Sequence, residues 1–180
     1  MRVFLAIELP QEVRDELAGL QKQLSTAPAK LGFAHEFHVT LKFLGEITPV
    51  KVDAVKSCLG NVKFKPFKAR LGKPGFFASG KNVRVVWVGI EPADEFIQLQ
   101  EMVNDALEKD FPREKNFKPH LTLARVKSVS DRNRFLQQLW QLKIGDFPFE
   151  VSEFKLKKST IGSSGAVYDD LALYGSQKGF

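Results

Sequence analysis

The stretch His38-Val39-Thr40-Leu41 returns 82 residues later as His120-Leu121-Thr122-Leu123. Chance likeness explains the leucines easily, but it explains the histidines poorly because the chain contains only three. The same shift, without a gap, aligns Val3 with Val85, Pro10 with Pro92, Thr48 with Ser130, and Pro66-Phe67 with Pro148-Phe149. A single offset that connects so many positions indicates an internal repeat.

The hydrophobic pattern predicts the same order of elements in both halves: strand, helix, strand, helix, strand. In the first half they cover residues 2–9, 10–25, 33–44, 48–59 and 62–71, followed by a loop from 72 to 82. In the second half they cover 83–90, 92–107, 118–126, 130–140 and 147–157, and a last strand covers 166–174. We therefore predict an α+β fold in which residues 1–180 form a single domain. Two similar lobes, each an antiparallel-rich sheet with outer helices, would flank a central cleft.

Composition excludes several classes of protein. The 180 residues give a prior of about one domain, and sixteen Phe exclude a wholly disordered chain. The one cysteine, Cys58, excludes an intramolecular disulfide framework and fits a cytoplasmic location. No apolar run approaches the ~18 residues of a membrane span, so we expect no membrane association.

The net charge of +6 favours an anionic partner, nucleic acid above all, although solubility alone is the alternative. Basic side chains gather in three clusters that could follow an RNA backbone. These clusters are Lys63 to Lys73, Arg113 to Lys118, and Lys155 to Lys158.

Each repeat copy places a histidine and a threonine on one face of a strand, because residues two apart project to the same side. Thus His38 shares a face with Thr40, and His120 shares a face with Thr122. A duplicated fold could bring both pairs into the central cleft. A single such pair is usually structural, whereas two copies at one repeat offset favour a function.

Such a cleft suits displacement at a phosphodiester. One imidazole serves as base and the other as acid, while the threonine hydroxyls donate to phosphoryl oxygens. Two histidines and two threonines do not supply the three or four ligands of a zinc site. We therefore predict neither a metal nor a cofactor.

The stretches His38–Gly45 (HVTLKFLG) and His120–Arg125 (HLTLAR) resemble the two signatures of the 2H phosphoesterases. The resemblance covers nearly the whole chain and is closest to the RNA 2′,3′-cyclic phosphodiesterases, historically called 2′-5′ RNA ligases. It implies that both His-x-Thr pairs line a cleft between two lobes. It implies hydrolysis of an RNA 2′,3′-cyclic phosphate end, or a related nucleotide, to a 2′-phosphate without a metal. It also implies weak, reversible 2′-5′ ligation in some members.

The resemblance extends to residues beside the motifs. Arg125 matches the family arginine after the second motif, and we expect it to bind phosphate. Strict alternation turns it away from His120, so a bulge or a reach around the strand edge would be needed. Phe43 matches a family aromatic near the site and could contact substrate, although alternation places it on the core face. Lys42 shares the face of His38 by alternation and could also contact substrate; a solvated edge lysine is the alternative.

Two other functions stay open: a ligase that works in the joining direction, and a non-catalytic RNA-binding module. Complete motifs favour an enzyme. Water, at roughly 55 M, favours hydrolysis unless the site positions an RNA hydroxyl and excludes water. The sequence favours a monomer but does not establish the oligomeric state. It names neither the RNA nor which histidine is the base.

Overall fold

The computed structural model describes residues 1–163 and 165–175. Within them the elements follow in the order β1 (Arg2–Glu8), α1 (Gln11–Leu24), β2 (Ala29–Phe33), β3 (His38–Glu46), α2 (Pro49–Leu59), β4 (Phe67–Ser79), β5 (Asn82–Glu91), α3 (Ala93–Leu107), β6 (His120–Val129), α4 (Arg132–Trp140), β7 (Phe149–Val151), β8 (Glu153–Gly162) and β9 (Gly165–Gly175). The strand pairs among these residues are all antiparallel. The predicted α+β class with antiparallel sheets is confirmed.

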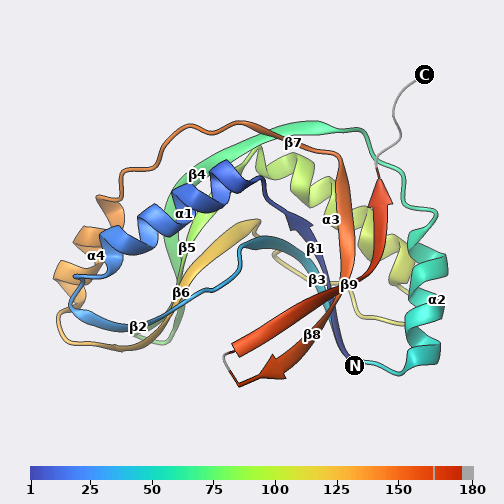
Figure 1. Cartoon of the computed structure of the whole chain (residues 1–180), viewed down its shortest axis with the longest axis horizontal. Helices are drawn as coiled ribbons and strands as arrows, with labels where there is room; N and C mark the ends of the chain where they lie inside the picture. The colour runs from blue at the N-terminus through green and yellow to red at the C-terminus, as the bar shows by residue number, and fades with distance from the viewer. Residues whose placement is uncertain (164, 176–180) are drawn as a thin grey trace.

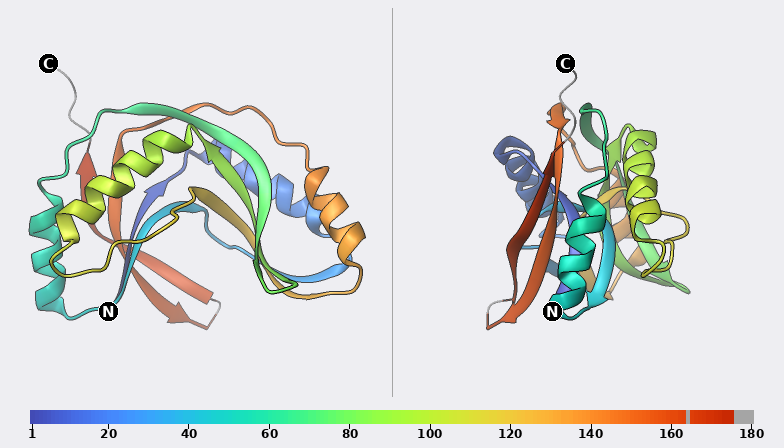
Figure 2. Two further views of the ribbon diagram at one scale, coloured as in Figure 1. Left: turned by 180° about the vertical axis from the view of Figure 1, so that it is seen from behind. Right: turned by 90° about the vertical axis from the view of Figure 1, so that its right-hand side faces the viewer.

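The described strands form two sheets that give the molecule the shape of an arch (Figure 1). One sheet has the strand order β3-β1-β8-β9, and the other has the order β2-β6-β5-β4-β7. Figure 2 shows that α2 and α3 lie together at one end of the arch, and α1 and α4 at the other. The strands β3 and β6, which carry the two histidines, lie next to each other where the sheets meet.

The two halves of the repeat exchange elements. In the first sheet β1 pairs with β8 from the second half, and in the other sheet β5 pairs with β4 from the first half. The helices are exchanged in the same way, since α1 contacts β6 and α3 contacts β3. Each lobe therefore contains residues of both halves, and neither half of the chain supplies a complete lobe.

The core lies between the sheets and the helices. Strand β1 is buried from Val3 to Ile7, as expected for a central strand covered on both faces. Helix α1 buries an apolar stripe at helical spacing against this core: Val13, Leu17, Leu20 and Leu24. Full burial of each such side chain contributes about 1.5–3 kcal/mol, so these stripes fix the strands that carry the histidines.

Several predicted boundaries are wrong. The predicted strands 33–44 and 62–71 begin only at His38 and Phe67, and the predicted strand 147–157 is divided into β7 and β8, which belong to different sheets. Strand β2 covers most of the segment between the predicted helix 10–25 and the predicted strand 33–44, where the sequence predicts no strand. Strand β4 runs to Ser79 through most of the predicted loop 72–82. Pairing of β2 with β6 and of β4 with β5 satisfies the hydrogen-bonding groups of these Gly- and Pro-containing backbones. Helix α4 is capped by Asp131, whose carboxylate accepts a hydrogen bond from the Arg134 N–H at 3.0 Å. The hydroxyl of Ser130, where the sequence predicts that this helix begins, instead donates to the Pro28 carbonyl at 3.0 Å.

The described helices include none that is both long enough and apolar enough to cross a membrane.

Candidate active site

Each His-x-Thr strand contains a β-bulge at the leucine that ends its motif. The register of β3 against β1 shifts at Leu41, and the register of β6 against β5 shifts at Leu123. These two leucines occupy the same position in the repeat. A bulge adds one residue to its strand, so side chains beyond it point to the opposite face from the one that alternation predicts.

The bulges turn Phe43 and Arg125, which are counterparts in the repeat, toward the face of the histidines. Phe43 is 67% exposed, and its ring centroid lies 5.9 Å from that of Phe4, which itself contacts His38. The expectation that Phe43 belongs to the core is therefore wrong. Arg125 is exposed and lies two residues beyond Leu123. The β-bulge at Leu123 turns its side chain toward the face of His120, which strict alternation did not allow.

The same shift turns Lys42 into the interior. Its side chain is only 2% exposed, and its ammonium donates to Asn104 Oδ1 at 2.8 Å and to the Pro112 carbonyl at 2.7 Å. Burial lowers the pKa of Lys42 below its ordinary value. The expectation that Lys42 shares the face of His38 and contacts substrate is wrong, because alternation is broken at Leu41. It is not a solvated edge lysine either.

The His38 ring is held by aromatic contacts. It lies 5.1 Å from the Phe4 ring and 5.3 Å, edge-on, from the Tyr168 ring. Burial and, to a smaller extent, the charge of Lys157 lower the pKa of His38 to about 4, while the charge of Glu8 opposes the change. His38 is therefore neutral at pH 7 in the free protein.

The His120 ring is held by a hydrogen bond as well as by rings. Its Nδ1 lies 2.7 Å from the carbonyl oxygen of Lys118. Because a carbonyl only accepts, Nδ1 carries the hydrogen, and in the neutral ring Nε2 is free to take a proton. The Phe77 ring lies perpendicular to the imidazole at 4.9 Å, and the Trp87 ring lies at 6.0 Å. Burial lowers the pKa of His120, the hydrogen bond to the Lys118 carbonyl raises it, and the charge of the Lys118 ammonium lowers it.

The structure brings the two histidines into one site. A charge on His120 lowers the pKa of His38, and β3 lies in contact with β6. Thr40 and Thr122 are partly exposed, each two residues beyond its histidine and before the bulge. They therefore project from the same faces as the histidines.

Tyr168 is a site residue that the sequence reasoning did not single out. Its ring contacts both Phe4 and His38 from β9. Burial raises its pKa, and the positive charge of Arg125 partly opposes this, which places Arg125 near the same site. No repeat partner marks Tyr168 in the sequence; only its place in the last predicted strand could have suggested it.

An ion network lies beside His38. Lys155 donates to Glu8 at 2.6 Å and to Asp170 at 2.7 Å; Lys157 bonds the same two carboxylates and is 5% exposed. Glu8 lies opposite His38 in the pairing of β1 with β3. The expectation that these two lysines follow an RNA backbone is wrong, because both are engaged by carboxylates.

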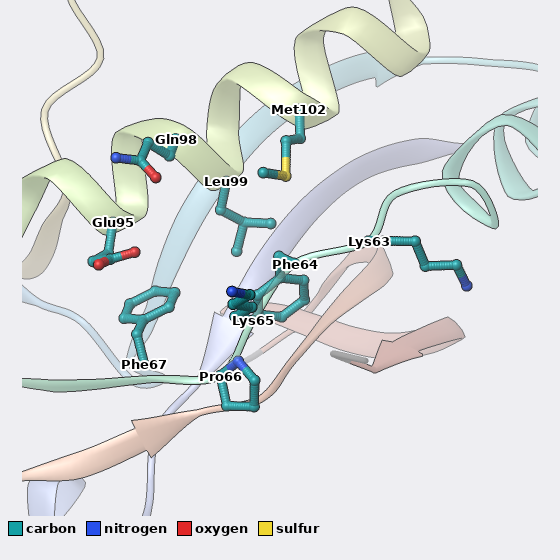
Figure 3. A pocket seen from close by; sticks show the side chains of 9 residues that line it. All are labelled: Lys63, Phe64, Lys65, Pro66, Phe67, Glu95, Gln98, Leu99 and Met102. Carbon is teal, nitrogen blue, oxygen red and sulfur yellow. The ribbon is translucent and has the colours of Figure 1, made fainter. Parts of the chain in front are cut away.

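Two observations concern other kinds of site. Among residues 1–163 and 165–175, no three His, Cys, Asp or Glu side chains gather as a metal ion would require. A hollow of about 570 Å³ lies between α3 and the segment 63–67, where Phe64, Leu99 and Met102 meet (Figure 3). It contains neither histidine, and it is separate from the site on β3 and β6.

Comparison with known proteins agrees with this fold. The chain matches the 2′-5′ RNA ligase superfamily over residues 9–160, and it belongs to this family. The expected membership in the 2H phosphoesterases is thereby confirmed.

Relatives and solved structures cover nearly the whole chain. An RNA 2′,3′-cyclic phosphodiesterase of Methanocaldococcus jannaschii is 30% identical over 171 residues, which are 94% of this chain and 97% of the relative. One of Archaeoglobus fulgidus is 32% identical, over 97% and 99%. The structure of TT0787 from Thermus thermophilus matches with a TM-score of 0.79 at 29% identity, covering 97% of each chain. Escherichia coli LigT complexed with 3′-AMP matches with a TM-score of 0.76 at 26% identity, covering 98% of each chain.

Proposed function

We propose that this protein hydrolyses the 2′,3′-cyclic phosphate at the end of an RNA to a 2′-phosphate, and that it does so in the cytoplasm. The observation that carries the proposal is the pairing of His38 and His120, one from each repeat copy, in a single site. Relatives of similar length bear the name of this activity, and the single Cys58 fits a reducing compartment.

The reaction needs one proton removed and one supplied. A water oxygen forms a new bond to phosphorus, and the bond from phosphorus to the ribose O3′ breaks. One histidine takes the proton of the water, and the other gives a proton to the departing O3′. The burial that lowers both histidine pKa values favours neutral rings, so the base is ready in the free protein. The acid gains its proton when the phosphate anion binds, because a nearby negative charge raises an imidazole pKa.

The remaining groups act on the phosphate. The hydroxyls of Thr40 and Thr122 donate hydrogen bonds to its non-bridging oxygens, and Arg125 adds a positive charge. Such donors stabilise the negative charge that grows on these oxygens in the transition state. Phe43 contacts the substrate from the rim of the site.

The direct test is to incubate the pure protein with adenosine 2′,3′-cyclic phosphate and to locate the phosphate on the product by ³¹P NMR. The expected product is 2′-AMP. Turnover to 3′-AMP would contradict the proposed bond cleavage, and tight binding without turnover would indicate an RNA-binding module. Adding an RNA with a 5′-hydroxyl tests the joining direction, which we expect to be a minor side reaction.

Independence from metals is part of the proposal. Turnover should persist after exhaustive chelation, since two histidines, two threonines and Arg125 supply the acid, the base and the charge. Activity that is lost on chelation and returns only with a divalent ion would overturn it.

A further inference from the structure

A cation and two aromatic rings form a second surface beside His120. The Lys118 ammonium lies 4.7 Å from the centre of the Trp87 ring, while the Lys118 side chain is exposed. Phe77 is 37% exposed, and its ring lies 5.3 Å from that of Trp87. Trp87 is 6% exposed and lies directly over Gly75, where any Cβ would collide with the indole. The tryptophan is therefore a fixed support.

The Lys118 ammonium is not needed to hold the His120 ring, although its charge lowers the pKa of His120. The His120 ring is oriented by the backbone carbonyl of Lys118, so the Lys118 ammonium is available for another purpose. In the part of the chain that the structure describes, the ion pairs do not include Lys118. On the other side of the site, by contrast, Lys157 forms ion pairs with Glu8 and Asp170.

An ammonium next to a partly exposed aromatic ring can bind the phosphate and the base of one nucleotide. A phosphate accepts charge-assisted hydrogen bonds from an ammonium. A nucleobase stacks on an exposed aromatic ring. Cation–π attraction to Trp87 holds the Lys118 ammonium near the site before substrate arrives, which reduces the entropy lost on binding.

We infer that Lys118 and Phe77 form a subsite for the nucleotide that precedes the cyclic phosphate in the RNA strand. Lys118 binds the phosphodiester on the 5′ side of the terminal ribose, and Phe77 stacks on the base of the preceding nucleotide. This inference rests on the proposed function and narrows its substrate class: the preferred substrate is a strand end, and a free cyclic mononucleotide is a poor one.

The test compares three substrates that add one group at a time. They are adenosine 2′,3′-cyclic phosphate, the same nucleotide with a 5′-phosphate, and the dinucleotide ApA ending in a 2′,3′-cyclic phosphate. Each added group should raise kcat/KM by about tenfold, mainly through KM. Equal kcat/KM for all three in the wild type would overturn the subsite and leave the proposed function standing.

Variants assign each gain to its residue. Lys118→Met keeps the carbonyl that holds His120 and should remove the gain from the 5′-phosphate, whereas Lys118→Arg should retain it. Phe77→Leu should remove the further gain of the dinucleotide, whereas any loss through its contact with His120 should be the same for all three substrates; Phe77→Tyr should retain the gain. Lys115→Met, at another exposed lysine of the same connection, is the matched control and should keep both gains. If Lys118→Met lowers kcat/KM equally for all three substrates, Lys118 acts only through His120 and the inference is wrong.

A binding measurement keeps the inference testable without turnover. Calorimetry with 2′-AMP and with the dinucleotide ApA 2′-phosphate should show about hundredfold tighter binding of the dinucleotide, and this preference should fall in Lys118→Met. If no substrate is hydrolysed yet this preference appears, the proposed function fails and the subsite stands.

Discussion

The two His-x-Thr strands have similar backbone geometry, but the side chains around their histidines differ. Both β3 and β6 carry a bulge at the same repeat position, so each presents a histidine, a threonine and a residue beyond the bulge on one face. Around His120 the ring is fixed by the Lys118 carbonyl and two aromatic rings. Around His38 the ring meets Phe4 and Tyr168, beside the ion network of β1, β8 and β9.

This difference explains how a duplicated fold can supply unlike groups. The backbone repeat brings two imidazoles into one site, and their neighbours shift the pKa of each. The charge of a nearby lysine lowers both pKa values, that of Lys157 at His38 and that of Lys118 at His120. The opposing groups differ: the charge of Glu8 at His38, and the backbone carbonyl of Lys118 at His120. The bulge residues also differ, since Phe43 offers a ring where Arg125 offers a charge. Asymmetry in the chemistry therefore comes from side chains outside the two motifs.

Removing either histidine should have the largest effect. His38→Ala and His120→Ala should each lower kcat about 10²–10⁴-fold, because each removes the acid or the base. The residual pH profiles should differ, since the base governs one limb and the acid the other. Steady-state rates from pH 4 to 9 measure this. His35→Ala, which removes the remaining histidine from the exposed β2–β3 connection, is the control and should retain turnover. Near-wild-type turnover in either site variant would refute the two-histidine mechanism.

Removing either threonine hydroxyl should lower kcat less than removing a histidine, and by a similar factor in both repeat copies. Valine preserves the shape and the strand preference, so Thr40→Val and Thr122→Val should fold normally. Loss of a donor to the developing charge should cost roughly 2–4 kcal/mol of barrier, or about 10²–10³ in kcat. Single-turnover rates with the cyclic nucleotide bound measure the chemical step directly. Wild-type rates in both variants would remove the threonines from the mechanism.

Breaking the ion network should have the smallest effect, and it should change the pKa of His38 but not that of His120. Lys157→Met removes a positive charge that lowers the pKa of His38, so this pKa should rise. The limb of the kcat/KM profile that reports on His38 should therefore move to higher pH, by less than about one pH unit. Lys158→Met, one residue along β8, is the matched control. An unchanged or downward-shifted limb would show that Lys157 does not act on His38.

Much of the fold could be predicted because the signals are local or repeated. Apolar residues at helical spacing with Pro and Gly at the ends predicted α2 within a residue of its bounds, and the repeat predicted the same order in both halves. The exchange of β4 and β8 between the lobes could not be predicted, because a repeat shows which elements are alike and not which ones pair. Strand β2 was missed since its Gly32 and the preceding Pro28 are typical of a loop.

Alternation along each strand predicted which face a side chain occupies only as far as the bulges at Leu41 and Leu123. His38, Thr40, His120 and Thr122 precede the bulges, so alternation placed them correctly relative to one another. Beyond the bulges alternation failed for Phe43 and for Lys42. Bulges depend on pairing with β1 and β5, which is long-range information that the motif itself does not contain. For the same reason Tyr168 and Lys157, which reach the site from β9 and β8, carried no local signal.

Titration of the histidine rings by NMR tests the central claim that His38 and His120 act together on one phosphate. In the free protein both rings should titrate below pH 6.5, with His38 near pH 4, because both are buried. Addition of 2′-AMP should raise both pKa values, since a bound phosphate favours the charged form of any imidazole beside it. The variants His38→Gln, His120→Gln and His35→Gln assign the signals. A ligand that shifts only one ring, or neither, would contradict a shared site and leave the repeat as a feature of the fold alone.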